Sequence, residues 1–149
     1  MTLPHTWQPY IHNCTGAAIE FSTDGANNTF TITGRPWNRD SDGAISFGDE
    51  VTIFSDPGSD LADDAILAGT EQDNSSNLYE GMFCTAKLDT DASTDGTIDI
   101  YIQWSTDGGT DYPDDAGDFD KEVIDTDLIL VASLATDSTD DDRAINFEL

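Results

Sequence analysis

The chain has 149 residues and a formal net charge of −26, from 31 acidic and five basic side chains. This length suits one domain with its own core. The charge argues against nucleic-acid binding, which needs a basic stripe that displaces counterions from phosphates, and against an anionic membrane surface. Three explanations of the acidity stay open: a hydrated surface in saline surroundings, which is favoured, carboxylates that bind divalent cations, and a basic partner.

The first fourteen residues have no basic region followed by an apolar stretch, so they do not read as a secretory signal. No run approaches the roughly 20 apolar residues of a membrane-spanning helix. Cys14 and Cys84 are the only cysteines. A disulfide and two free thiols both fit this pair, and free, buried thiols are favoured in a chain made in a cytoplasm.

The dominant hydrophobic period is two, which predicts β-strands. Strands are expected at 17–23, 28–33, 44–55, 78–88, 97–104, 128–134 and 143–149. In the run 97–104, three isoleucines and Trp104 share one face, and polar or tyrosine side chains take the other. The run 128–134 is apolar almost throughout, which predicts a strand buried on both faces.

Asp-Gly turns separate these runs, since Asp and Gly accept the backbone conformations of reversing turns. Short strands at this spacing predict an all-β fold, an antiparallel β-sandwich of jelly-roll type. The exception is 59–69, where Ser59 or Asp60 can cap a helix and Gly69 can end it. At most one short helical turn is expected there.

No catalytic pattern stands out. A pair of Cys14 with His12 would need the two side chains about 3 Å apart and an orienting third group, and nothing in the sequence indicates this. The carboxylates lie in Asp-Gly turns, where they are exposed and ionised, whereas a glycosidase needs one carboxyl with a raised pKa in a cleft. A non-enzymatic protein without a cofactor is therefore expected.

The segment 91–96, DASTDG, has the form that opens a calcium-binding loop. Its oxygen-bearing metal candidates are Asp91, Ser93, Asp95 and, further along, Asp99. An EF-hand loop ends with a Glu at its twelfth position, which here is Ile102, inside an expected strand. A plain β-turn is favoured, and a Ca²⁺ or Mg²⁺ ion on another group of carboxylates stays open.

The second half of the chain carries a set of spaced motifs: Leu78-Tyr79, Asp95-Gly96, GTIDIY at 96–101, STDGGT at 105–110 and Tyr112-Pro113-Asp114-Asp115, followed by the apolar runs LILVASL and AINFEL. This half, 78–149, resembles small virion structural proteins of tailed bacteriophages, the decoration or cement proteins of the capsid. The motifs cover about half the chain, and residues 1–77 carry none of them.

The resemblance implies a non-enzymatic protein bound in many copies to the outside of the phage head, where it stabilises capsomer junctions. The partners it implies are the major capsid protein and further copies of the chain, often as trimers. Assembly in the host cytoplasm, without a nucleic-acid or membrane partner, fits this role. Related sandwiches serve in tails, baseplates or fibres, or bind carbohydrate for host attachment, and these alternatives stay open.

Two segments are predicted to contact a partner. An N-terminal arm or extended segment, 1–16, is aromatic and short of strand pattern, as in arms that order on docking, and 17–149 form a single sandwich domain. The segment RPWNR at 35–39 concentrates positive charge beside a tryptophan, which suits an acidic neighbour. The predicted contact residues are His5, Trp7, Tyr10, Ile11, Arg35, Trp37 and Arg39.

Overall fold

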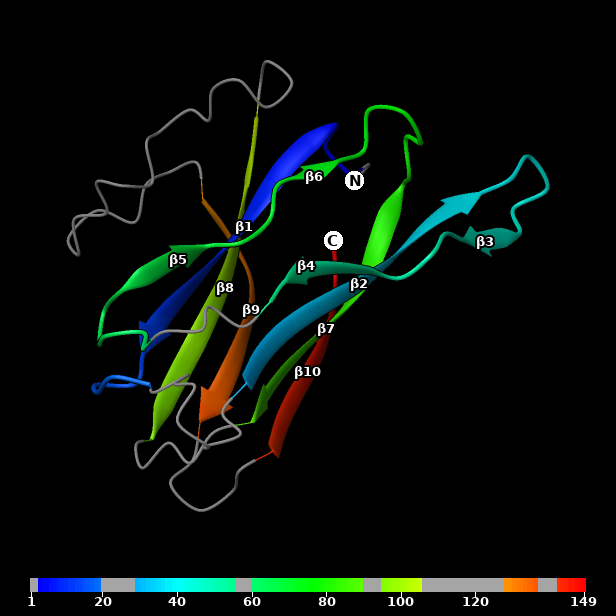
Figure 1. Ribbon diagram of the computed structural model, residues 1–149. Coiled ribbons are helices and arrows are strands. Elements are labelled where there is room, and N and C mark those ends of the chain that lie inside the picture. The colour runs from blue at the N-terminus through cyan, green and yellow to red at the C-terminus, as the bar shows by residue number, and fades with distance from the viewer. Residues whose placement is uncertain (1–2, 20–28, 56–59, 90–94, 106–127, 137–141) are drawn as a thin grey trace.

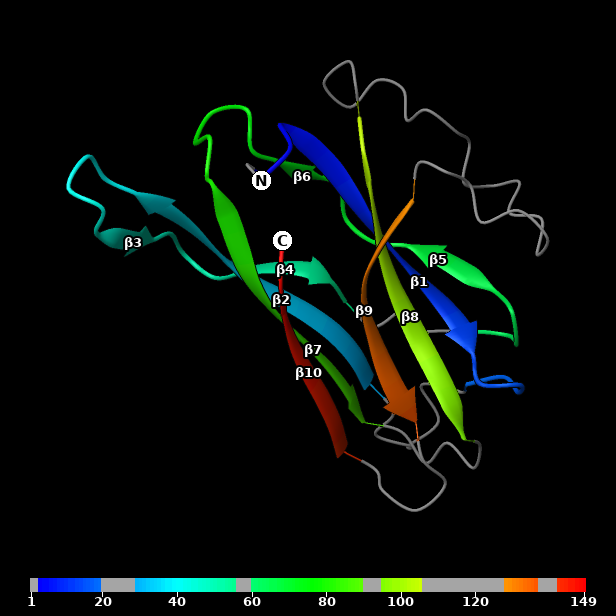
Figure 2. The ribbon, with the colours of Figure 1, turned by 180° about the vertical axis from the view of Figure 1, so that it is seen from behind.

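The structure is a computed structural model, and it describes residues 3–19, 29–55, 60–89, 95–105, 128–136 and 142–149. Two antiparallel sheets pack against each other in two layers (Figures 1 and 2). These residues contain no helix. The predicted all-β sandwich is confirmed.

The first sheet has the order β5-β1-β8-β9, and β6 also pairs with β1. Its strands are β1 (Thr6–Cys14), β5 (Ile66–Ala68), β6 (Gln72–Asp73), β8 (Gly96–Trp104) and β9 (Ile129–Thr136). The second sheet has the order β10-β7-β2-β3, and β4 also pairs with β2. Its strands are β2 (Thr29–Arg39), β3 (Ile45–Phe47), β4 (Val51–Phe54), β7 (Gly81–Asp89) and β10 (Asp142–Glu148).

The core fills the space between the sheets, because alternate side chains of each strand point inward. In β7 the inward residues Met82, Cys84, Ala86 and Leu88 are all buried, as the periodicity predicts. The largest fully buried side chains include Trp7, Phe30, Phe54, Ile11, Ile32, Ile53, Ile98 and Ile100. Leu78, expected on the same face as Met82, instead lies in the loop before β7 with a positive φ of 49° and is exposed.

Residues 6–14, expected within an N-terminal arm, form the central strand β1. It pairs with β8 along its whole length, from Trp7 opposite Trp104 to Cys14 opposite Thr97. On its other side it pairs with β5 and β6. The expectation of an arm is wrong for these residues. Pro9, which lacks a backbone N–H and argues against a central strand, obscured the alternation of buried side chains on either side of it.

Residues 128–134 were expected to form a strand buried on both faces. The strand β9 instead lies at the edge of the first sheet, and Leu130 is 53% exposed. Only alternate residues, Ala132, Leu134 and Thr136, are buried. The prediction of a strand buried on both faces is therefore wrong for this apolar run.

The helical turn allowed within 59–69 is absent from the described residues 60–69. Ala65 donates its N–H to the carbonyl of Ala62 in a β-turn, and Leu61 pairs with Ile19 in an isolated bridge. The buried side chain of Asn13 donates to the carbonyls of both Leu61 and Ala62, at 3.0 Å each. Because these carbonyls are already engaged, they are not free to start a helix. Of the predicted strand 17–23, residues 17–19 are described, and among them Ile19 forms this bridge.

The position of β1 makes a direct prediction about stability. Ile11 is fully buried in the core, and Leu130 is a comparable aliphatic side chain at the surface. Ile11→Ala should lower the free energy of unfolding by about 2–5 kcal/mol, and Leu130→Ala should change it by less than about 0.5 kcal/mol. Urea denaturation of both variants measures this. Similar midpoints for the two would contradict a central β1.

Candidate functional site

The strands β2 and β3 extend beyond the body of the sandwich as a hairpin (Figure 1). Its turn is built around Asp40, whose carboxylate accepts the N–H groups of Asp42 at 2.9 Å and Ala44 at 2.8 Å. Gly43 has a φ of 84°, a conformation that costs glycine little. The hairpin is therefore closed by specific contacts and holds β3 in register with β2.

Arg35, Trp37 and Arg39 occupy alternate positions of β2, so they share the outer face of the second sheet. The register places Trp37 opposite Phe47 on β3 and Arg35 opposite Phe83 on β7. These five side chains form one surface, here called the arginine–aromatic face. The fold thus brings together Arg35, Trp37 and Arg39, which the sequence predicts as contact residues.

The side chains of the arginine–aromatic face pack on one another. The rings of Trp37 and Phe83 are stacked with centroids 6.2 Å apart, and Phe47 and Phe83 are 6.1 Å apart. The guanidinium of Arg35 lies 5.7 Å from the Phe47 centroid, and that of Arg39 lies 5.8 Å from Trp37. Aromatic pairs contribute about 0.5–1.5 kcal/mol and exposed cation–π contacts about 0.5–1 kcal/mol. These contacts restrict the side chains before any partner binds.

Gly81 gives Trp37 room to lie flat on β7. A Cβ at this glycine would come within 2.7 Å of the indole atoms Cε2, Cζ2 and Nε1. A rigid indole cannot absorb such an approach by bending, so any larger residue at this position displaces it. The backbone of Glu80, next to Gly81, also donates to the carbonyl of Trp37 at 3.0 Å.

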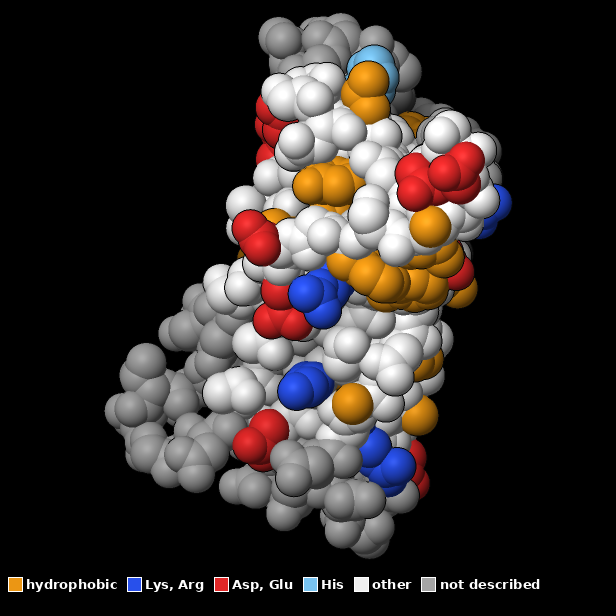
Figure 3. Space-filling model, turned by 90° about the vertical axis from the view of Figure 1, so that its right-hand side faces the viewer, with side chains coloured by type: hydrophobic (Ala, Val, Ile, Leu, Met, Phe, Trp, Pro, Cys, Tyr) orange, Lys and Arg blue, Asp and Glu red, His pale blue; other side chains and the backbone are white. Residues whose placement is uncertain are grey.

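The face remains open to solvent although it is rich in apolar groups. Phe47 is 52% exposed and Phe83 is 44% exposed, and the neighbouring Ile45 is 48% exposed. Figure 3 shows hydrophobic side chains gathered on the side of the molecule that faces the viewer, with Lys and Arg side chains near them. An exposed apolar cluster bordered by charged groups is typical of a binding surface.

Positive charge is concentrated on the same sheet. All the basic residues of the described part of the chain, Arg35, Arg39, Lys87 and Arg143, belong to β2, β7 or β10 of the second sheet. The fifth, Lys121, lies outside the described residues. In a chain with a net charge of −26, this is the region where an acidic partner meets the least repulsion.

The other predicted contact residues do not form a surface. His5 is exposed, but Trp7 and Ile11 are almost fully buried in the core. Tyr10 is 4% exposed and packs with Tyr101 and Leu128 on the outer side of the first sheet. Trp7, Tyr10 and Ile11 are therefore not free to contact a partner in this fold, because their side chains are already buried within the chain.

Phe47 and Phe83 belong to the face although the local sequence does not indicate it. Alternation alone places Phe83 on the outer side of β7, opposite in direction to Met82 and Cys84. It does not say that β7 lies beside β2, or that β3 folds back on it. Strand neighbours come only from the pairing of residues distant in sequence.

A second group of chemically active side chains lies on the outer side of the first sheet. The Cys14 sulfur is 3.1 Å from Nδ1 of His12 and donates to the Asp99 carboxylate at 3.7 Å. Asp99 also accepts a hydrogen bond from Ser133 at 2.5 Å. The close Cys14–His12 approach, for which the sequence offered no indication, is thus present, but Asp99 contacts the thiol and not the histidine that a third group would have to orient.

The electrostatics of this group oppose a nucleophilic cysteine. Burial, together with the negative charge of Asp99, raises the pKa of the Cys14 thiol from 9.0 to about 11. Catalytic cysteines have a lowered pKa, since the thiolate is the nucleophile. Cys84 is also a free thiol, and its burial raises the pKa to about 12. The predicted free thiols are confirmed, although Cys14 is only partly buried.

No group of three or more His, Cys, Asp or Glu side chains with metal-binding geometry occurs within the described ranges. Of the calcium candidates, Asp91 and Ser93 lie outside those ranges, and Asp95 and Asp99 lie within them. Asp99 is engaged by Cys14 and Ser133. The described candidates are therefore not assembled into a cation site.

Compared with known proteins, the chain matches no family model, no curated protein and no solved structure. In the part of the chain that the structure describes, no helix is long and apolar enough to cross a membrane. Function is therefore inferred from the contacts of the chain itself and from the motifs of its second half.

The raised pKa of Cys14 predicts its reactivity. In a Cys84→Ala variant, alkylation by iodoacetamide should be slow at pH 8 and should accelerate about tenfold per pH unit up to about pH 11, because only the thiolate reacts. Asp99→Asn removes the neighbouring negative charge, so it should lower the pKa and speed the reaction at pH 8. A rate that levels off below pH 8 would contradict this, since it would indicate a thiolate paired with a protonated His12.

Proposed function

We propose that this protein is a non-enzymatic structural component of a tailed-phage particle, a capsid decoration protein that docks on the outer head surface through its arginine–aromatic face. The partners are the major capsid protein and neighbouring copies of the same chain at capsomer junctions. The protein is made in the host cytoplasm and resides on the virion. The observation that carries this proposal is the preassembled cluster of Arg35, Trp37 and Arg39 on β2, Phe47 on β3 and Phe83 on the neighbouring β7.

The composition of the face supports a protein partner. Tryptophan, other aromatic residues and arginine dominate the binding energy of protein interfaces, mainly where they are desolvated at the centre. Here two arginines and three aromatic rings already contact one another, so docking orders few additional side chains. Preorganisation of this kind raises affinity by reducing the entropy lost on binding.

The charge distribution supports an outward orientation. Arg35 and Arg39 favour an acidic patch on the partner, whereas the rest of the strongly acidic chain is repelled by such a patch. The protein therefore docks with the second sheet toward the shell and the first sheet away from it. Many identical copies on a symmetric shell raise a modest affinity through avidity.

The sequence motifs in residues 78–149 support a role in a phage particle. The arginine–aromatic face supports the proposed way in which the protein attaches to that particle. A tail, baseplate or fibre protein would use the same surface in fewer copies. Quantitative mass spectrometry of purified particles separates these roles, because a decoration protein is present at a simple ratio to the major capsid protein. A few copies per particle would indicate a tail protein instead. Absence of the protein from purified particles would reject the structural role.

The attachment surface is tested with a matched pair of variants. Phe47 and Leu130 are exposed to the same extent, at 52% and 53%, but lie on opposite sheets. Phe47→Ser should weaken co-sedimentation with undecorated particles of the encoding phage at least tenfold, about 1.4 kcal/mol, whereas Leu130→Ser should leave it unchanged.

Gly81→Ala supplies an independent check, because it removes no side chain from the face and only displaces the indole of Trp37. It should also weaken particle binding. Added salt should weaken binding of the unchanged protein through the screening of Arg35 and Arg39. Equal losses for Phe47→Ser and Leu130→Ser, or no loss for either, would reject this face as the docking surface.

A further inference from the structure

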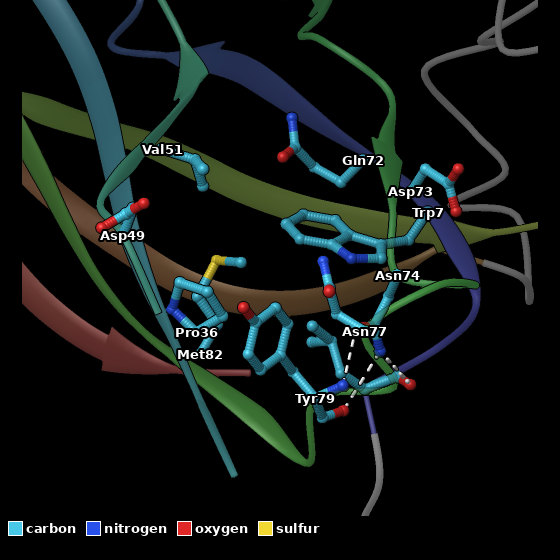
Figure 4. Close-up of a pocket in the computed structure, with 11 residues that line it drawn as sticks. Trp7, Pro36, Asp49, Val51, Gln72, Asp73, Asn74, Asn77, Tyr79 and Met82 are labelled. Atoms are coloured by element: carbon cyan, nitrogen blue, oxygen red, sulfur yellow. Dashed lines mark hydrogen bonds between the residues drawn. The ribbon is translucent and has the colours of Figure 1, made fainter. Parts of the chain in front are cut away.

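A cavity of about 240 Å³ lies between the two sheets at the base of the projecting hairpin (Figure 4). Its inner wall is formed by the buried residues Leu3, Trp7, Pro36, Asn74 and Met82. Its rim carries the exposed residues Asp49, Asp73 and Asn77. Val51, Gln72 and Tyr79 complete the lining. A buried floor below a polar rim is the usual form of a small-ligand site.

One buried polar group in the lining has no partner. The indole N–H of Trp7, a residue only 1% exposed, donates to no acceptor within the described part of the chain. The side chains of Asp49, Asn77 and Tyr79 are exposed or partly exposed at the same cavity. An unpaired buried N–H costs free energy, which a ligand acceptor recovers.

The wall around these groups is held in place by a neighbouring buried amide. The side chain of Asn74 donates to the carbonyls of Tyr79 at 3.1 Å and Leu3 at 3.3 Å, and accepts the N–H of Tyr79 at 2.8 Å. On the opposite side, a Cβ at Gly48 would lie 2.7 Å from the Tyr79 hydroxyl oxygen. Asn74 thus fixes the wall at Leu3 and Tyr79, and the glycine at position 48 leaves the Tyr79 hydroxyl uncrowded.

The charges of the lining restrict the ligand. Asp49 and Asp73 are acidic and no Lys or Arg lines the cavity, so an anion is disfavoured. A simple cation would satisfy the carboxylates but offers no acceptor to the N–H of Trp7. A neutral molecule with both hydroxyl donors and acceptors satisfies both requirements.

The size of the cavity restricts the ligand further. Its volume of about 240 Å³ is below the roughly 300–1,000 Å³ of sites for drug-sized ligands, and it suits a single ring with its substituents.

We propose that this cavity binds one neutral sugar residue. The Tyr79 hydroxyl, the Asn77 amide and the Asp49 carboxylate bind its hydroxyl groups, and the apolar surfaces of Pro36 and Met82 contact its ring. Figure 4 shows the Asn77 amide turned toward the Trp7 indole, so rotation of this exposed side chain gives the ligand access to Nε1. The site is separate from the arginine–aromatic face and does not depend on particle attachment.

Saturation-transfer NMR on the free, full-length protein tests this site with glucose, galactose, mannose and N-acetylglucosamine, each alone. At least one should bind, with a Kd on the order of 1 mM, as expected for so small a ligand. The double variant Asp49→Ala/Tyr79→Phe should weaken that binding at least tenfold. Its matched control, Tyr101→Phe, removes a tyrosine hydroxyl outside the cavity and should leave binding unchanged.

Trp7→Phe removes the unpaired N–H and should also reduce binding, with Trp104→Phe as its control. If circular dichroism shows that Trp7→Phe does not fold, the double variant Asp49→Ala/Tyr79→Phe still tests the site, because it changes only partly or fully exposed side chains. The proposal is overturned if none of the four sugars binds, or if the double variant binds as well as the unchanged protein. Binding of only acetate, glycine betaine or uridine would overturn it as well. Phe47→Ser should leave sugar binding intact, which separates this site from the docking face.

Discussion

The antiparallel pairing of β1 with β8 is the interaction on which the rest of the structure depends. It turns the side chains of Trp7 and Ile11 into the core and gives β5 and β6 a strand to pair with. At the end of β1, the buried amide of Asn13 satisfies two carbonyls of the segment that leads into β5. A buried amide that satisfies several backbone groups is costly to remove, since each group would be left unpaired.

The same sandwich separates the charges of the chain. Because the core admits almost no ionised group, the carboxylates of the described part lie outside it, and the basic residues of that part collect on the second sheet. Strand β2 carries Arg35 and Arg39 of this basic region and supplies part of the cavity wall through Pro36. Docking face and cavity are thus neighbours because one strand contributes to both.

The group of His12, Cys14 and Asp99 shows that proximity alone does not define a catalytic site. The Cys14–His12 distance resembles that of a nucleophile and its base. Asp99, however, contacts the thiol itself, and burial of the thiol together with the negative charge of Asp99 raises the pKa of Cys14. A carboxylate that contacted only the histidine would have the opposite effect on reactivity.

Local sequence determined which side chains share a face of a strand, because the period of two is a property of the extended backbone itself. It thereby placed Met82, Cys84, Ala86 and Leu88 in the core and grouped Arg35 with Trp37 and Arg39. Only the tertiary structure decided that β1 lies at the centre of its sheet, that β9 lies at an edge, and that Phe47 and Phe83 join the arginines. Neighbouring strands are chosen by hydrogen bonds and packing between residues far apart in the chain, and no local pattern encodes that choice.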